Sequence, residues 1–124
     1  MAGAIATVLI CDDEPALREL IRVSLHGAYE FVECDDGEAC LALARERRPD
    51  VVVLDVMMPL RNGLDVLADL RQDDELMDTK VIVLTAQPTT RDEAVRAGAD
   101  VVMVKPFAPD DINAAVEEVL GRQT

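Results

Sequence analysis

The stretch from Val51 to Gly63 reads VVVLDVMMPLRNG, and it decides the fold predicted for the chain. Four apolar residues in succession, mostly β-branched, are typical of a central strand covered on both faces, as in a parallel sheet. The strand ends at Asp55, and Pro59 and Gly63 force a turn after it. A carboxylate at the carboxyl end of such a strand lies where open α/β sheets place their ligand crevice. Asp55 is therefore the first candidate functional residue.

Four other segments have the composition of short strands. Residues 6–11, 81–84 and 101–104 are apolar and end at polar residues, whereas residues 29–34 mix apolar and acidic side chains and suit the edge of a sheet. Helical patterns lie between the strands, so the chain is predicted to fold as an α/β domain. We expect a five-stranded parallel sheet of the flavodoxin-like order 2-1-3-4-5, with helices on both faces.

Apolar spacing and capping residues predict five helices. Asp36 suits the N-cap of the second helix, and Thr90 with Glu93 has the spacing of a capping box at the start of the fourth. The expected limits are Pro15 to Gly27, Asp36 to Pro49, Leu64 to Gln72, Thr90 to Gly98 and about Pro109 to Leu120. No linker or repeat is visible, so residues 1–124 are predicted to form one domain.

Charge and hydropathy exclude several classes of partner. The chain has 25 acidic and 12 basic residues, a net charge of −13, and such a field repels the phosphate backbones of nucleic acids. No apolar run approaches the roughly 18 residues of a membrane helix, and no signal peptide is visible. The three cysteines, Cys11, Cys34 and Cys40, lack the spacing of a metal site and sit inside apolar segments. We therefore expect a cytoplasmic protein with reduced, buried cysteines and no direct contact with nucleic acid or membrane.

Polar residues stand at the ends of the predicted strands. They are Asp12 and Asp13, Asp55, Thr85 and Lys105, and right-handed crossovers place them all at one edge of the sheet. Two carboxylates about 5 Å apart repel by roughly 3 kcal/mol at an effective dielectric of about 20, so a cation is expected among them. Hard oxygen ligands suit Mg²⁺. With the metal on one side and Lys105 on the other, Asp55 is placed to attack phosphorus and to hold an acyl phosphate.

These residues, in this order, resemble the receiver domains of two-component response regulators, including the single-domain chemotaxis type. The resemblance covers nearly the whole chain. It rests on the pair Asp12 and Asp13, the string from Asp55 through Met58 and Pro59 to Gly63, Thr85 with Ala86, and the run Lys105, Pro106 and Phe107.

The resemblance implies a phosphoacceptor and a metal site. Asp55 would take a phosphoryl group from a partner histidine kinase or histidine phosphotransfer protein, and binding to a downstream protein target would then change. Asp13, Asp55 and the backbone carbonyl of Met57 would hold Mg²⁺, or Mn²⁺ in its place, with Asp12 acting mainly through water.

The resemblance also implies roles for two further side chains. Thr85 would be the switch hydroxyl that moves towards the phosphoryl group, Lys105 would be its counter-charge, and the peptide between Lys105 and Pro106 would be cis. The chain would be a signalling domain rather than an enzyme, with at most self-phosphorylation from small donors and slow autodephosphorylation.

Three positions are compared with the family pattern. Receivers commonly carry Tyr or Phe three residues before the lysine, and Val102 stands there. A valine has no ring to swing between buried and exposed positions, so phosphorylation would act through Thr85 and backbone shifts alone, or would barely act at all. Met57 and Gln87 flank the site at positions that tune phosphoryl lifetime in the family. Met57 offers no polar group to position water, which predicts slow self-hydrolysis.

Other readings remain open from the residues alone. Asp12 and Asp13 also suit a cap of the first helix, and Asp55 alone suits a turn. An aspartyl phosphohydrolase of the haloacid dehalogenase type is an alternative, but such enzymes carry a second acid two residues after the nucleophile, where Met57 stands. A nucleotide-binding or flavin-binding module is a third hypothesis, and the chain lacks a glycine-rich phosphate loop after its first strand.

Overall fold

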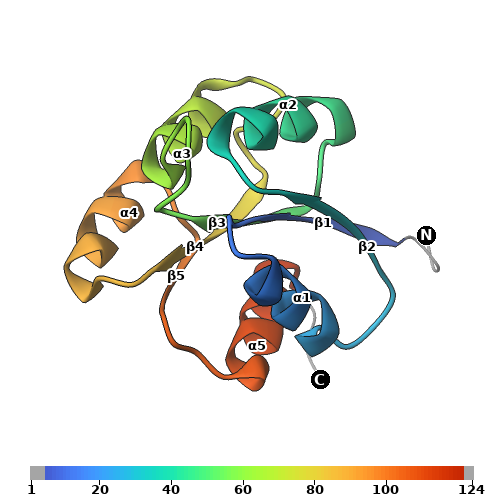
Figure 1. Cartoon of the computed structure of the whole chain (residues 1–124). Helices are drawn as coiled ribbons and strands as arrows, with labels where there is room; N and C mark the ends of the chain where they lie inside the picture. The colour runs from blue at the N-terminus through green and yellow to red at the C-terminus, as the bar shows by residue number, and fades with distance from the viewer. Residues whose placement is uncertain (1–4, 122–124) are drawn as a thin grey trace.

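The computed structural model describes residues 5–121 and contains a five-stranded sheet (Figure 1). The strands pair in parallel in the order β2-β1-β3-β4-β5, as predicted. Their bounds are β1 (Ala6–Cys11), β2 (Tyr29–Cys34), β3 (Val51–Asp55), β4 (Lys80–Thr85) and β5 (Val101–Val104).

Helices cover both faces of the sheet (Figure 1). Helices α1 and α5 pack on one face, and α2, α3 and α4 pack on the other. Their bounds are α1 (Pro15–Ser24), α2 (Gly37–Arg47), α3 (Gly63–Gln72), α4 (Arg91–Ala97) and α5 (Pro109–Val119), with a short 3₁₀ turn η1 (Pro88–Thr90) before α4.

Strand β3 is the centre of the core. All five of its residues are buried, which is what the uninterrupted apolar run predicts for a strand covered on both faces. Val51 and Val53 pack towards α1 and α5, whereas Val52 and Leu54 pack towards α2, α3 and α4. Strand β2 lies at the edge and is only partly buried, as its mixed composition predicts.

Most helix signals have the predicted effect, and two do not. The Asp36 side chain caps α2 by accepting a hydrogen bond from the Ala39 N–H at 2.7 Å. The capping box predicted for Thr90 and Glu93 is wrong, because Thr90 has helical backbone angles after the η1 turn and its side chain makes no capping bond. An N-cap needs extended backbone, so a residue already in a helical turn cannot serve. Helix α1 also ends earlier than predicted, at Ser24.

The burial of the cysteines agrees only partly with the prediction. Cys11 and Cys40 are buried, but Cys34 is half-buried because it ends the edge strand. All three are free. Among residues 5–121, no helix has the length and the apolar character that crossing a bilayer requires.

Candidate functional site

Four elements of the sheet bring the predicted polar residues to one edge. Asp12 and Asp13 follow β1, Asp55 ends β3, Thr85 ends β4 and Lys105 follows β5. Asp12, Asp55 and Thr85 are buried, with exposed fractions of 0%, 3% and 3%, whereas Asp13 is exposed. The parallel topology therefore assembles the site from residues far apart in sequence.

The three carboxylates form a compact acidic cluster. One oxygen each from Asp12, Asp13 and Asp55 lies within 4.8 Å of the others. Oxygen donors at this spacing, two of them on buried residues, fit a hard divalent cation such as Mg²⁺, which binds carboxylates and keeps several waters. Asp13 faces solvent, so the cluster has an open side for such waters.

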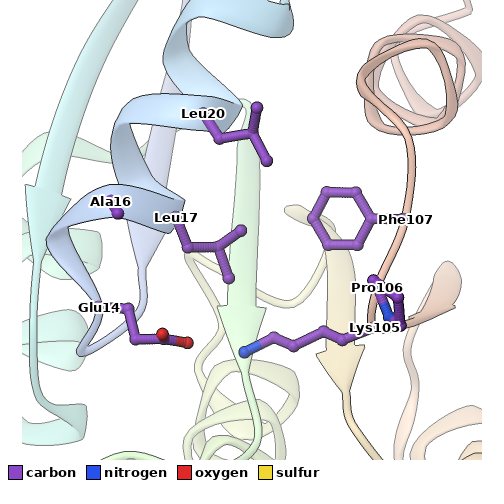
Figure 2. A pocket seen from close by; sticks show the side chains of 7 residues that line it. All are labelled: Glu14, Ala16, Leu17, Leu20, Lys105, Pro106 and Phe107. Atoms are coloured by element: carbon purple, nitrogen blue, oxygen red, sulfur yellow. The ribbon is translucent and has the colours of Figure 1, made fainter.

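Lys105 supplies the positive charge of the site. Its Nζ lies 3.2 Å from Asp12 Oδ2 and 3.2 Å from Asp55 Oδ1. Figure 2 shows its side chain reaching from the β5 side of the site towards the end of β3. Burial lowers the pKa of Lys105, but the attraction of Asp55 and Asp12 outweighs burial, and the net effect raises that pKa. Lys105 is therefore firmly protonated.

One lysine does not neutralise the carboxylates beside it. Burial, and then repulsion from Asp12, raise the pKa of Asp55 above its ordinary value, although Lys105 opposes both effects. The surroundings therefore disfavour the ionised form of Asp55, and a further cation beside it would stabilise that form.

Asp12 has both a structural and an electrostatic role. Its Oδ1 accepts a hydrogen bond from the Glu14 N–H at 2.9 Å, at the start of α1, while its Oδ2 faces Lys105. The capping interpretation and the site interpretation of this residue are therefore compatible. Arg18, which sequence reasoning missed, donates from Nη1 to the Asp12 carbonyl at 2.6 Å. No pattern in the sequence points to that contact, because it depends on how α1 lies against β1.

Thr85 is in place at the end of β4, but its hydroxyl bonds locally. Thr85 Oγ1 accepts a hydrogen bond from the Gln87 N–H at 3.0 Å and lies 3.3 Å from the Gln87 carbonyl oxygen. The hydroxyl thus fixes the loop after β4 in the state described by the structure. To act on a group bound at Asp55, it would have to exchange these partners.

The loop after β3 is held close to the site by a glycine. A Cβ added at Gly63 would lie 2.2 Å from the Asp55 carbonyl oxygen, so only glycine fits. The Gly63 N–H also donates to the Val56 carbonyl at 2.8 Å, and Asn62 caps α3 by accepting from the Asp65 N–H at 3.0 Å. Sequence reasoning identified Gly63 as a turn residue and missed its contact with Asp55.

Two other features of the site are the peptide before Pro106 and the position of Met57. The peptide between Lys105 and Pro106 is cis, as expected. Met57 lies in the loop after β3 with its side chain 72% exposed, so nothing polar from that side chain covers Asp55.

A hollow of about 340 Å³ opens beside Lys105, between α1 and the loop after β5. Figure 2 shows its apolar walls, which include Leu17, Leu20 and Phe107, with Glu14 at its rim. The hollow adjoins the Lys105 ammonium, so a molecule seated there would approach Asp55.

A family model described as the response regulator receiver domain matches residues 8–117. The chain belongs to this family. It is the receiver domain of a two-component response regulator, and such domains act as phosphoacceptors in signalling rather than as classical enzymes.

Curated relatives and solved structures agree with the family. The receiver domain is 38% identical to the probable transcriptional regulatory protein TcrX of Mycobacterium tuberculosis over 97% of this chain and 52% of TcrX. It is 35% identical to the phosphate regulon regulatory protein PhoB of Pseudomonas aeruginosa over 94% of this chain and 52% of PhoB. The chain therefore spans about half the length of the curated relatives it matches.

Solved receiver structures share the fold over nearly their whole length. A response regulator from Chloroflexus aurantiacus superposes with a TM-score of 0.89 at 30% identity, covering 96% of this chain and 100% of that one. The chemotaxis response regulator CheY4 of Vibrio cholerae superposes with a TM-score of 0.86 at 28% identity, covering 94% of this chain and 99% of that one.

Proposed function

We propose that Asp55 of this receiver domain accepts a phosphoryl group from a phosphohistidine on a partner histidine kinase or histidine phosphotransfer protein. One observation carries the proposal: the buried Asp55 carboxylate lies 3.2 Å from Lys105 and within 4.8 Å of two further carboxylates. A buried acid with a cation beside it and an acidic cation-binding cluster around it matches the needs of phosphoryl transfer.

Each residue has a distinct part in the proposed transfer. An Asp55 carboxylate oxygen forms a bond to phosphorus while the phosphorus–nitrogen bond to the donor imidazole breaks, and the imidazole keeps that electron pair. Lys105 neutralises charge on the phosphoryl oxygens. The Thr85 hydroxyl leaves Gln87 and donates a hydrogen bond to a phosphoryl oxygen, which couples phosphorylation to the loop after β4.

The cation site completes the proposal. Asp13, Asp55 and the backbone carbonyl of Met57 would hold Mg²⁺, or Mn²⁺ in its place, and Asp12 would act mainly through water. When bound, the ion would offset the negative charge of the phosphoryl group and the carboxylates. The exposed, apolar Met57 side chain cannot orient an attacking water, so we expect the aspartyl phosphate to hydrolyse slowly; a lifetime of a few seconds would contradict this.

The partner surface follows from the position of the hollow. Its apolar walls at Leu17, Leu20 and Phe107 adjoin Lys105, so a kinase or phosphotransfer helix with apolar side chains seated there would present its phosphohistidine to Asp55. A downstream protein would then distinguish the phosphorylated state. Direct nucleic-acid binding by this domain is not proposed, because the net charge of −13 opposes it.

The test is intact mass spectrometry after incubation with acetyl phosphate, with and without Mg²⁺. We expect one phosphoryl group to be gained only with Mg²⁺, and none by Asp55→Asn. Asp74→Asn is the matched control, because Asp74 is exposed and lies before β4, at the opposite end of that strand from Thr85.

A phosphoryl group gained equally by wild type and Asp55→Asn would overturn the assignment of Asp55. If acetyl phosphate gives no transfer, the same comparison is made with a phosphorylated histidine phosphotransfer protein. Failure of both donors would overturn the phosphoacceptor proposal.

A further inference from the structure

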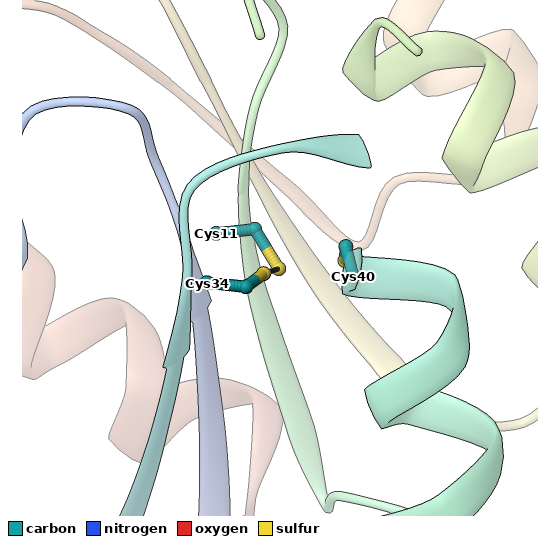
Figure 3. Close-up of side chains that lie close together, drawn as sticks. All are labelled: Cys11, Cys34 and Cys40. Atoms are coloured by element: carbon teal, nitrogen blue, oxygen red, sulfur yellow. Dashed lines mark hydrogen bonds between the residues drawn. The ribbon is translucent and has the colours of Figure 1, made fainter. Parts of the chain in front are cut away.

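Three cysteines converge beside the phosphoacceptor site, although their sequence spacing gives no sign of it. Cys11 ends β1, Cys34 ends β2 and Cys40 lies in the first turn of α2. One sulfur from each lies within 4.8 Å of the others, and the Sγ atoms of Cys11 and Cys34 are hydrogen-bonded at 3.0 Å (Figure 3). The cluster is separate from the acidic site and plays no part in the proposed transfer.

The backbone already places Cys11 and Cys34 where a disulfide can form. The two residues are direct partners in the parallel ladder between β1 and β2, so their side chains leave the sheet on the same face. Neighbouring strands lie about 4.8 Å apart. That spacing falls within the Cα–Cα range of about 4.4–6.8 Å found in disulfides. Cross-linking the pair therefore needs side-chain rotation rather than movement of a strand.

The surroundings of the three cysteines favour a disulfide, which is uncharged, over a metal ion held by three thiolates, which adds negative charge. Cys11 and Cys40 belong to an apolar cluster that includes Leu41 and Leu54. Carboxylates lie close by as well, because Asp12 follows Cys11 directly and Asp35 and Asp36 act electrostatically on Cys34. A metal held by three thiolates would place further negative charge in this apolar and acidic region. A disulfide carries no charge.

We propose that Cys11 and Cys34 are a reversible redox site, which a hydroperoxide such as hydrogen peroxide converts to an intramolecular disulfide. Cys34 is the least buried of the three cysteine residues, so its thiol is the one expected to react first. Its thiolate attacks one peroxide oxygen, the oxygen–oxygen bond breaks, and Cys34 becomes a sulfenic acid as hydroxide leaves. The Cys11 sulfur then attacks the Cys34 sulfur, water leaves with the Cys11 proton, and the disulfide forms.

The position of the pair gives the cross-link a defined structural effect. The Asp12 N–H donates to the Cys34 carbonyl at 3.2 Å, immediately beyond the paired cysteines. A disulfide would therefore tie β1 to β2 at the point where the chain enters the acidic cluster. Cys40 would remain a free thiol against the cross-link.

The test uses the full chain, first reduced, then treated with hydrogen peroxide without denaturant, and finally alkylated under denaturing conditions. Mass spectrometry should show the loss of two hydrogen atoms, one alkylated thiol at Cys40, and a peptide pair joining Cys11 to Cys34. Dithiothreitol should restore three alkylatable thiols. Cys40→Ser should still form the disulfide, whereas Cys11→Ser and Cys34→Ser should not form that pair.

The measurement on the wild-type chain decides the proposal even if a variant folds poorly. Addition of two or three oxygens to Cys34 without a disulfide would overturn it, as would a disulfide through Cys40 or one between two chains. One Zn²⁺ or Cu⁺ retained per chain in native mass spectrometry, with all three thiols protected from alkylation, would also overturn it in favour of a metal site.

Discussion

At the scale of single residues, Asp55 combines burial with a concentration of like charge. It is 3% exposed, it faces Asp12 and Asp13 across the cluster, and Lys105 is the cation at its side. A carboxylate in this setting is a candidate functional group, because burial and the neighbouring Asp12 carboxylate disfavour its ionised form until a further cation binds.

Neutralising Asp55 should therefore stabilise the metal-free protein. We expect Asp55→Asn to raise the free energy of unfolding at pH 7 by about 1 kcal/mol, the size of a typical single-residue effect. The folded state raises the pKa of Asp55, so it binds the proton more tightly than the unfolded state does. Ionisation then destabilises the fold. Urea unfolding in the presence of a chelator measures the difference.

The pH dependence provides the control for that prediction. The advantage of Asp55→Asn should be absent below the ordinary carboxyl pKa of 3.8 and should grow as the pH rises through the raised pKa of the folded protein. Asp74→Asn should show no such trend. An advantage that shrinks with rising pH would contradict the electrostatic account.

Leu60 is a second residue whose surroundings destabilise the fold, in this case through its backbone conformation. Its φ of 69° lies in the left-handed region, and its side chain is 77% exposed, so little burial offsets the strain. Leu60→Gly should raise the free energy of unfolding by about 1 kcal/mol. Leu60→Ala keeps a Cβ at the same backbone angle and should change stability little. Equal stabilisation by both variants would show that the exposed side chain, and not the backbone, is the cause.

At the scale of elements, the junction of β3 with α3 positions Asp55, the proposed phosphoacceptor. Asp55 ends the strand, and Gly63 begins the helix with its Cα packed against the Asp55 carbonyl. The loop between them carries Met57, the residue whose carbonyl is expected to contact the metal. Helix and strand thus hold both ends of that loop.

Adding a methyl group at Gly63 should disturb this junction. The new Cβ would lie 2.2 Å from the Asp55 carbonyl oxygen, which is backbone and cannot rotate away. We expect Gly63→Ala to lower the free energy of unfolding by about 2–3 kcal/mol. Gly121→Ala is the control, because a Cβ there meets nothing within 4 Å and only the φ of 73° opposes it. A smaller loss at Gly63 than at Gly121 would contradict this reading.

Strand β5 carries Val102 at the position where receivers commonly have an aromatic residue. Val102 pairs with Val83 of β4 and packs against the cluster under α2, α3 and α4. It fills the core as any β-branched residue would. Nothing at this position can swing out as a ring, so the loop after β4, held by Thr85 and Gln87, is the element we expect to respond.

At the scale of the whole molecule, topology explains which features the sequence predicted. Parallel strands with right-handed crossovers bring their carboxyl ends together, so Asp12, Asp13, Asp55, Thr85 and Lys105 could be placed at one edge without coordinates. Contacts that depend on the packing of one element against another could not.

Three features illustrate what the sequence could not predict. Arg18 reaches the Asp12 carbonyl only because of the way α1 lies on the sheet, and Thr90 lost its capping role to a preceding 3₁₀ turn. The cysteines converge because β1 and β2 pair in a register that aligns Cys11 with Cys34. The hydrophobic pattern fixes which face of the sheet a side chain occupies, but the spacing of the cysteines does not show which residue of β1 pairs with which residue of β2.

The acidic cluster should also make the stability of the whole domain depend on Mg²⁺. A cation that binds only the folded state stabilises it, so Mg²⁺ should raise the melting temperature of the wild type by several degrees. Asp13→Asn should reduce that rise while leaving the metal-free melting temperature nearly unchanged, because Asp13 is exposed.

Sodium chloride at matched ionic strength separates specific binding from screening of the net charge of −13. Equal rises with both salts, in both proteins, would contradict a specific site.

The strand order also leads us to expect a particular order of assembly during translation. Strand β1 lies between β2 and β3, so Asp12 and Asp55 can come together once β3 has left the ribosome. Lys105 follows fifty residues after Asp55. A nascent chain of intermediate length therefore holds two mutually repelling acids without the ammonium that joins them later. Cooperative closure of the sheet is expected to wait until the fifth strand has been synthesised.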